Sequence, residues 1–168
     1  MYPILIYAKM SSVPKSDQKP PKESAAEMVQ VVLPNDANPL GNILGGRVMH
    51  WIDLVGAVVA SRHSHRPVVT ASMERLDFHS PIRVGYIVLL KGSLHYVGKT
   101  SMEVGVEVYS EDPRTGQRTH TSSAILTYVA LDDNGKPTSV PKLLLETDEE
   151  KRCFKAAEER RLKRMQER

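Results

Sequence analysis

Hydrophobic and polar residues alternate along much of the second half of the chain, as they do in half-buried β-strands. The clearest stretch runs Met102-Glu103-Val104-Gly105-Val106-Glu107-Val108-Tyr109. Strand-like stretches also cover residues 26 to 33, 67 to 78, 85 to 96 and 122 to 131. Short turns join the later strands, which predicts antiparallel neighbours, because a parallel crossover needs roughly a dozen residues.

A different pattern covers residues 46 to 61, where GRVMHWIDLVGAVVAS is apolar on nearly all sides. The segment is too long for a typical strand and predicts a buried helix. One apolar helix wrapped by a long antiparallel sheet is an α+β architecture. A last helix is predicted after Pro141, because Thr147 and Glu150 have the spacing of a capping box and basic residues follow.

The length of 168 residues suits one compact domain. Residues 1 to 24 are predicted to be a flexible leader, because residues 9 to 24 are rich in Lys, Ser and Pro. Residues 25 to 145 would form the domain and residues 146 to 168 a charged helix, with Met10 as an alternative start. The opening run from Tyr2 to Ala8 is too short for a signal peptide, and no stretch is long enough to span a bilayer.

Composition and charge narrow the class of protein. The chain has 40% hydrophobic and 26% charged residues, which is ordinary for a globular protein, and its net charge is only +3. Cys153 is the single cysteine, which excludes an intramolecular disulfide and suits a cytoplasmic location. Glutamates interrupt the basic C-terminal end and no aromatic stacking pattern accompanies it, so neither nucleic acid nor a membrane is expected as a partner.

Asp53 is the only charged residue between Arg47 and Arg62, in the middle of the apolar helix. An unpaired carboxylate in such a place costs several kcal/mol or more. It either caps a backbone group or pairs with an arginine, or it serves as a general base or nucleophile. The residue alone leaves both interpretations open.

The loop from Asn35 to Gly46 leads directly into this helix and is dense in Asn, Pro and Gly. Free backbone N–H groups at a helix N-terminus can stabilise an oxyanion or hold an anion. The same residue types are the usual formers of plain turns. The loop is therefore a candidate site that needs support from other parts of the chain.

Several ordered motifs lie within residues 28 to 145. They are Asp36-Ala37-Asn38, Gly41-Asn42-Ile43-Leu44-Gly45-Gly46, Met49, Ile52-Asp53, Gly56-Ala57, Val69-Thr70-Ala71, Asp77-Phe78, Pro81-Ile82, Val84-Gly85, Val97-Gly98-Lys99-Thr100-Ser101, Thr127-Tyr128-Val129-Ala130 and Pro141. Together they resemble the hotdog-fold acyl-CoA thioesterases, in particular the bacterial acyl-CoA thioesterases and the brain-type acyl-CoA hydrolases. Tyr86 departs from the family pattern, in which an aspartate commonly follows Val84-Gly85.

The resemblance implies a hotdog fold, which agrees with the strand, helix and four strands expected from periodicity. It also implies a homodimer with shared active sites, often assembled further into a hexamer. Asp53 would be the catalytic carboxylate, faced by Asn38 of the neighbouring subunit. Asp53 would activate water or attack the thioester directly to give an anhydride, while Asn38 would orient the water or the carbonyl. The N–H groups of Gly45 and Gly46 would stabilise the oxyanion, at about 3 kcal/mol per well-placed donor.

Coenzyme A would be part of the substrate and product, so no cofactor and no metal are expected. The resemblance places its pantetheine and phosphates near a set of polar residues, namely Thr70, Ser72, Gly98, Lys99, Thr100 and Ser101, with Arg83 as a further candidate. Lys99 would supply a point charge for a phosphate. The alternative for Lys99 is an ordinary exposed lysine in a hairpin.

Two other classes of function fit parts of the same sequence. A hotdog module that binds acyl-CoA without turnover would have no need of a carboxylate against the thioester. A hotdog dehydratase would require a histidine paired with a carboxylate, and His50 lies one turn before Asp53. The spacing of His63 and His65 could suit a metal, but Arg62 and Arg66 oppose a cation, so a surface turn is predicted there.

Overall fold

The computed structural model of the protein describes residues 18 to 166. Its elements are, in chain order, β1 (Gln18–Lys19), the 3-10 helix η1 (Pro21–Glu23), β2 (Ala26–Val31), η2 (Pro34–Asp36), α1 (Gly45–Ser64), β3 (Val68–Phe78), β4 (Ile87–Val97), β5 (Ser101–Glu111), β6 (Arg118–Ala130), β7 (Lys142–Leu143) and α2 (Asp148–Gln166). The α+β class is confirmed. Within the described range, neither α-helix is long and apolar enough to cross a bilayer.

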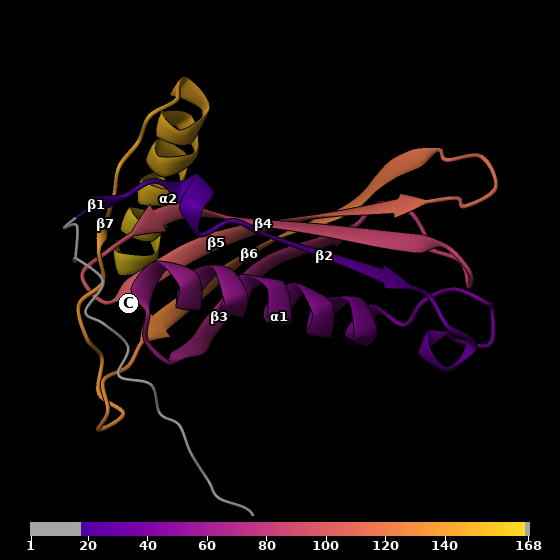
Figure 1. The fold of residues 1–168 in the computed structure, drawn as a ribbon, viewed down its shortest axis with the longest axis horizontal. Coiled ribbons are helices and arrows are strands. Elements are labelled where there is room, and N and C mark those ends of the chain that lie inside the picture. The colour runs from indigo at the N-terminus through magenta and orange to yellow at the C-terminus, as the bar shows by residue number, and fades with distance from the viewer. Residues whose placement is uncertain (1–17, 167–168) are drawn as a thin grey trace, which may run out of the picture.

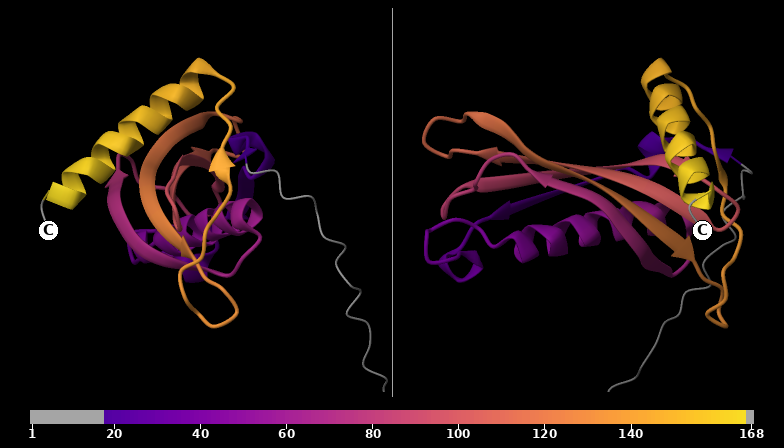
Figure 2. Two further views of the ribbon diagram at one scale, coloured as in Figure 1. Left: turned by 90° about the vertical axis from the view of Figure 1, so that its left-hand side faces the viewer. Right: turned by 180° about the vertical axis from the view of Figure 1, so that it is seen from behind.

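The main sheet has five strands in the order β2-β4-β5-β6-β3, and every neighbouring pair is antiparallel. α1 lies along one face of this sheet (Figure 1). The sheet curves around α1, and α2 lies on the outer side of the curve (Figure 2). β2 and β3 are the edge strands, so each presents one unpaired row of backbone groups in the single chain.

The core lies between α1 and the inner face of the sheet. Alternate residues of β5 are completely buried, as the sequence pattern predicts, and α1 contributes a stripe spaced at three and four residues. These residues are Met102, Val104, Val106 and Val108 on β5, and Val48, Ile52, Val55 and Val59 on α1. Burying one such side chain contributes about 1.5–3 kcal/mol, so this contact fixes how α1 sits on the sheet.

The outer side of α1 differs from the sequence prediction of a helix buried nearly all round. Met49, Leu54 and Val58 are 43%, 42% and 41% exposed in the single chain. At 3.6 residues per turn, Leu54 points away from the stripe that packs on the sheet, while Met49 and Val58 lie on opposite flanks of the helix. One sheet covers only one side of a helix, which explains the difference.

α2 forms ion pairs with a buried carboxylate on the outer face of the sheet. Glu103 on β5 is only 3% exposed, and Arg160 donates to its Oε1 at 2.6 Å. Arg164 lies 3.7 Å from Oε2 of the same residue and also pairs with Glu74 on β3. The polar outer face predicted for β5 is therefore covered by two arginines of α2.

The capping box predicted for the last helix is confirmed. The N–H of Glu150 donates to Oγ1 of Thr147 at 3.1 Å, and the N–H of Thr147 donates to Oε2 of Glu150 at 3.0 Å. These backbone bonds also lower the pKa of Glu150. The reciprocal bonds fix the start of α2, which begins at Asp148 and is described as far as Gln166; residues 167 and 168 fall outside the described residues.

Part of the predicted flexible leader is structured. β1 pairs in parallel with β7, and the N–H of Leu144 donates to the carbonyl of Lys19 at 3.1 Å. Pro20, Pro21 and Ser24 are buried. This pairing was not predictable, because two paired residues carry no periodicity. The run Tyr2 to Ala8 and Met10 fall outside the described residues.

β6 begins at Arg118 rather than at residue 122. The β5–β6 hairpin continues to the pair Glu111 and Arg118, whose side chains form an ion pair at 2.5 Å. An ion pair between facing residues stabilises a sheet without any apolar alternation. This part of the strand therefore escaped a prediction based on hydrophobic periodicity.

His63 is buried, which corrects the prediction of a surface turn at this residue. It is 0% exposed, its Nε2 lies 2.8 Å from the carbonyl of Pro141 and its Nδ1 lies 3.3 Å from Oγ of Ser24. Burial lowers the pKa of His63; the bond to Pro141 opposes this, while Lys19 adds to it. A neutral His63 thus connects α1 to segments near both ends of the described chain.

Acidification is expected to destabilise the protein partly through His63. The pKa of His63 is lower in the folded state than its unfolded value near 6.5, so protonation favours the unfolded chain. Stability should be full above about pH 6.5 and fall below it, by up to about 1.4 kcal/mol per pH unit, until the folded pKa is reached. Thermal unfolding should show a smaller loss on acidification for His63→Gln than for wild type; an equal loss would contradict this role.

Candidate active site

α1 places Asp53 on its flank, next to the fully buried Ile52 and beside the inner face of β3 and β6. Thr70 on β3 and Tyr128 on β6 face each other in the register of these strands. Both side chains meet the carboxylate of Asp53, which is half-buried. The site therefore combines one residue from the helix with two from paired strands.

The two carboxylate oxygens of Asp53 have different surroundings. Oγ1 of Thr70 donates to Oδ1 of Asp53 at 2.7 Å. The hydroxyl of Tyr128 lies 3.1 Å from the same Oδ1 and 2.9 Å from the backbone carbonyl of Asp53. Over residues 18 to 166, Oδ2 receives no hydrogen bond and Asp53 forms no ion pair. The carboxylate is thus held at one oxygen and left unbonded at the other.

This arrangement rules out the arginine-pair interpretation of Asp53. The free-energy cost of partly burying this carboxylate is offset by two neutral hydroxyl groups rather than by a cation. An anionic carboxylate with one unbonded oxygen can accept a proton from water or attack a carbonyl carbon.

The loop that carries Asn38 is fixed at both ends by Asp36. The carboxylate of Asp36 is 8% exposed, and its Oδ1 lies 2.8 Å from Nε of Arg47 on α1. The N–H of Leu33 donates to its Oδ2 at 3.2 Å. Gly41 has a φ of 77°, in the left-handed region that favours glycine, and its N–H donates to the carbonyl of Asn38 at 2.9 Å. Asp36 was not among the residues expected to have a role, although its contacts determine the shape of this loop.

The side chain of Asn38 is oriented by its own loop. Its Oδ1 accepts from the N–H groups of Leu40 at 3.0 Å and Asn42 at 3.2 Å. These two donors identify the oxygen, so the amide nitrogen points away from them. Within the described chain this nitrogen has no hydrogen-bond partner. Asn38 can therefore donate to a carbonyl or water from outside the loop.

A cavity of about 420 Å³ adjoins this loop. It is lined by Asn38, Asn42, Ile43, Gly45, Phe78, His79, Ser80, Pro81 and Ile82. Oγ of Ser80 is buried without a hydrogen-bond partner among the described residues. The cavity combines apolar walls with unbonded polar groups, as ligand sites commonly do.

Gly45 and Gly46 form the first turn of α1 and are exposed. Leu44 precedes them without a side-chain cap, and within residues 18 to 166 their N–H groups have no backbone acceptor. The first N–H groups of a helix lack partners within the helix and favour negative charge. This geometry suits their expected part as oxyanion donors.

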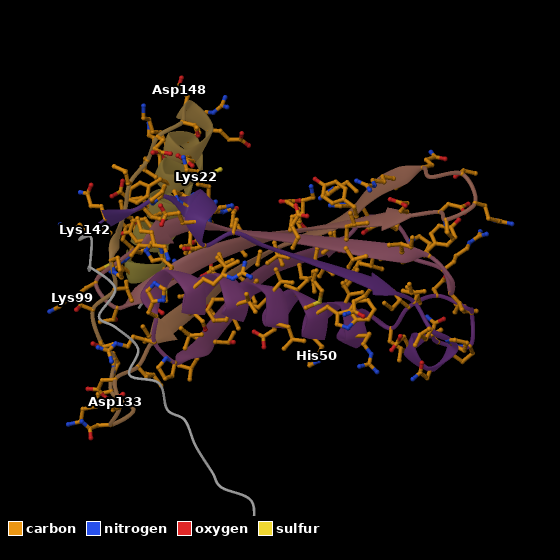
Figure 3. The ribbon with its side chains drawn as sticks, in the orientation of Figure 1. Lys22, His50, Lys99, Asp133, Lys142 and Asp148 are labelled. Atoms are coloured by element: carbon orange, nitrogen blue, oxygen red, sulfur yellow. The ribbon has the colours of Figure 1, made fainter. Side chains whose placement is uncertain are left out.

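Asn38 and Asp53 do not meet within one chain. Asp53 lies two turns into α1, roughly 12 Å along the axis from Gly45 at 1.5 Å per residue. No hydrogen bond joins the two residues in the described part of the chain. His50, one turn before Asp53, projects from α1 away from the sheet (Figure 3).

The proposed CoA residues fall into separate groups. Gly98 to Ser101 form the tight β4–β5 turn, in which the N–H of Gly98 donates to the carbonyl of Ser101 at 2.8 Å. Lys99 is exposed there, and Thr100 accepts from the N–H of Ala130 at 3.0 Å. Lys99 and Lys142 lie at the same end of the molecule (Figure 3). The turn thus presents a cation and backbone groups at one end of the sheet.

Arg83 and Ser72 do not join this group in the single chain. Arg83 bridges to Asn42, beyond the other end of β4, and a strand of this length spans roughly 35 Å. A β-bulge separates Thr70 from Ser72, which pairs with Thr127. Because successive residues of β6 point to opposite faces, Ser72 lies on the face opposite to Thr70.

Comparison with known proteins decides the family. Residues 40 to 117 match the model of the thioesterase superfamily. The Bacillus subtilis protein YkhA, named as an uncharacterized acyl-CoA thioester hydrolase, is 43% identical over 129 residues, covering 77% of this chain and 75% of YkhA. The chain belongs to the hotdog-fold acyl-CoA thioesterases.

Solved structures of acyl-CoA thioesterases have the same fold. An apo-hexameric acyl-CoA thioesterase is 41% identical with a TM-score of 0.85, covering 89% of this chain and 96% of its own. The Staphylococcus aureus acyl-CoA hydrolase, in complex with butyryl coenzyme A, coenzyme A and coenzyme A disulfide, is 35% identical with a TM-score of 0.81, covering 89% of this chain and 94% of its own. Variants of that hydrolase with an aspartate, an asparagine or a threonine replaced by alanine have also been solved.

Two residues of this acyl-CoA thioesterase escaped the sequence analysis. Tyr128 contacts Asp53, but in the sequence it stands only within the family motif Thr127-Tyr128-Val129-Ala130, with no role of its own. Arg161 of α2 donates to the hydroxyl of Tyr96 at 3.2 Å and lies against Gly98 in the β4–β5 turn. A helix and a turn so distant in sequence could not be paired from periodicity.

The histidines of the thioesterase do not form a metal site in the described range. No group of three His, Cys, Asp or Glu side chains there could hold a metal ion. His63 is bonded to protein groups, as described above, and His65 ends α1 with a φ of 51°. Asp53 and the Asn38 loop therefore remain the candidate site of the thioesterase.

Proposed function

We propose that this protein hydrolyses acyl-CoA to a free fatty acid and coenzyme A, with Asp53 of one subunit and Asn38 of the partner subunit forming each site. The observation that carries the proposal is the carboxylate of Asp53, held at Oδ1 by two hydroxyls and unbonded at Oδ2. Among residues 18 to 166 no protein group is bonded to Oδ2, so this oxygen can take a proton from water or attack a carbonyl carbon.

A dimer formed through β3 would complete the site. β3 is an edge strand, with Thr70 near its start beside Asp53 and Phe78 at its end in the cavity of Asn38. If two copies pair antiparallel along β3, the Thr70 end of one strand lies against the Phe78 end of the other. This pairing would bring the cavity of Asn38 toward the carboxylate of Asp53 of the partner subunit.

The solved relatives support this assignment. Along the chain of the S. aureus hydrolase, the replaced asparagine, aspartate and threonine have the same order and spacing as Asn38, Asp53 and Thr70. The hexameric relatives support a trimer of such dimers for this chain. Thr70 then belongs with the carboxylate, which it contacts, rather than with the CoA phosphates.

The reaction needs one water molecule per thioester. Oδ2 of Asp53 either takes a proton from water as it attacks the carbonyl carbon, or attacks that carbon itself to give an anhydride that water then opens. In both routes the C–S bond breaks, coenzyme A leaves with a proton on sulfur, and oxygen from water ends in the acid. The N–H groups of Gly45 and Gly46 and the amide of Asn38 would stabilise the negative charge on the carbonyl oxygen.

Coenzyme A would lie with its phosphates toward the β4–β5 turn, where Lys99 is exposed and Arg161 lies against Gly98. Both cations suit an anionic group, and the guanidinium also offers paired donors. The proposed chemistry uses only protein groups and water, so coenzyme A takes part as substrate and product and not as a resident cofactor.

Purified protein is expected to release free thiol from a series of acyl-CoAs of increasing chain length. The release should be saturable and should depend on Asp53, because the rate comes from a positioned carboxylate. A thiol-reactive dye follows the product, and buffer without protein is the control. Binding of the same acyl-CoAs without thiol release would contradict hydrolysis and favour the non-catalytic module.

A further inference from the structure

Tyr128 carries a buried hydroxyl directed at the proposed catalytic residue. Its side chain is 0% exposed, and it lies among the apolar residues of the core. The hydroxyl is 2.9 Å from the backbone carbonyl of Asp53 and 3.1 Å from Oδ1 of Asp53. The same polar group therefore contacts both the helix backbone and the reactive side chain at one residue.

The contact requires a glycine on α1. A Cβ atom at Gly56 would lie 2.9 Å from two ring carbons of Tyr128, and closer still to its hydroxyl. Real Cβ atoms do not approach other atoms this closely, so only glycine allows the ring to reach Asp53. Glycine in the middle of a helix costs about 0.5–1 kcal/mol relative to alanine. Glycine at residue 56 therefore lowers the stability of α1 but allows Tyr128 to approach Asp53.

The hydroxyl of Tyr128 acts as a donor. Burial, followed by the negative charge of Asp53, raises the pKa of Tyr128. The phenol thus keeps its proton, and a phenol in contact with a carboxylate donates to it. Its single proton is shared between Oδ1 and the backbone carbonyl of Asp53, so Oδ1 accepts one hydrogen bond from Thr70 and one shared bond from Tyr128, while Oδ2 has no donor among residues 18 to 166.

We propose that Tyr128 is a positioning residue for the thioesterase reaction: with Thr70 it fixes Oδ1 of Asp53, so that Oδ2 is the oxygen presented to water or the thioester. Two donors at one oxygen fix the rotation of the carboxylate about its Cβ–Cγ bond. A reacting group misplaced by about 1 Å can lose about 100-fold in rate, so this restraint acts on turnover rather than on substrate binding. The inference rests on the proposed role of Asp53.

The deciding variant is Tyr128→Phe, which removes the hydroxyl and keeps the ring. Its kcat for acyl-CoA hydrolysis is expected to fall about 10- to 100-fold, while KM changes by less than about threefold. Tyr86→Phe is the matched control, because Tyr86 also donates to a carboxylate, at 3.3 Å from Oδ2 of Asp112, far from Asp53 in the sheet. Tyr86→Phe is expected to retain wild-type kcat.

A second measurement separates positioning from a purely structural role. If the hydroxyl acts through Asp53, Tyr128→Phe should not lower the residual rate of Asp53→Asn any further. A structural defect would lower the rate of both backgrounds alike. Gly56→Ala keeps the hydroxyl but displaces it, so it should reproduce the loss in kcat, which keeps the inference testable if Tyr128→Phe folds poorly.

The outcomes distinguish this inference from the proposed function. Loss of activity in Asp53→Asn with wild-type kcat in folded Tyr128→Phe would overturn the role of Tyr128 alone. Full activity in Asp53→Asn would overturn the proposed function itself. A loss in Tyr128→Phe that appears entirely in KM would also overturn the positioning role.

Discussion

Asp53→Asn is expected to lower kcat by about 1,000-fold, the largest single effect predicted for this chain. The substitution keeps the shape of the side chain and an oxygen that can accept from Thr70 and Tyr128. It removes the negative charge and the basic oxygen that would activate water or attack the thioester. Initial rates of thiol release over a range of acyl-CoA concentrations give kcat and KM, and KM should change little.

Asp132→Asn is the matched control for this substitution. Asp132 is a turn aspartate whose Oδ1 accepts from the N–H groups of Asn134 and Lys136, both at 2.9 Å. Its loss should affect the turn without affecting turnover. If Asp53→Asn retained half of the wild-type kcat, this carboxylate would not be the catalytic group.

Mixing two inactive variants is expected to restore activity. Each shared site contains Asp53 of one subunit and Asn38 of the other, so a dimer of Asn38→Ala chains, or of Asp53→Asn chains, has one altered residue in both of its sites. A mixed dimer has one site with both changes and one site with neither. When equal amounts of the two chains are unfolded and refolded together, half of the dimers are mixed, and activity should recover to about a quarter of the wild-type value.

The control is the double variant Asn38→Ala/Asp53→Asn, refolded with wild type, in which every mixed dimer has two damaged sites. The mixture should have about a quarter of the activity of the same total amount of wild type, all from pure wild-type dimers, which is half of what its wild-type chains would give alone. If the two single variants failed to restore any activity after mixed dimers had been verified by distinct tags, both residues would belong to one subunit's site.

The fold was predictable because its main signals are local. The alternation of β5 and the long apolar segment of α1 each report burial within a few residues, and both are as expected. The pairing of β1 with β7 was not predictable, because it joins two-residue segments at opposite ends of the described chain. The exposed outer side of α1 was not predicted either. An apolar residue indicates burial, but it does not show whether its own chain or a partner chain covers it.

The candidate site was predictable only in part. Asp53 is conspicuous in the sequence because a charge interrupts an apolar helix, and the family motifs point to Asn38. The role of Tyr128 depends on three elements meeting at one oxygen, which no spacing in the sequence expresses. The face that Ser72 occupies was not predictable, because a bulge changes which face a strand residue occupies and bulges leave no reliable hydrophobic signature.

The carboxylate buried under α2 joins one residue of the sheet to two arginines of the C-terminal helix. Glu103 lies near the start of β5 with Arg160 and Arg164 as its counter-charges. If both arginines were replaced by apolar residues while α2 stayed in place, the acid would remain buried with neither cation, and an uncompensated buried charge costs about 3–5 kcal/mol. Much of the stability margin of a small domain would be spent in this way. An acid at residue 103 and the arginines that neutralise it must therefore be gained or lost together when related chains diverge.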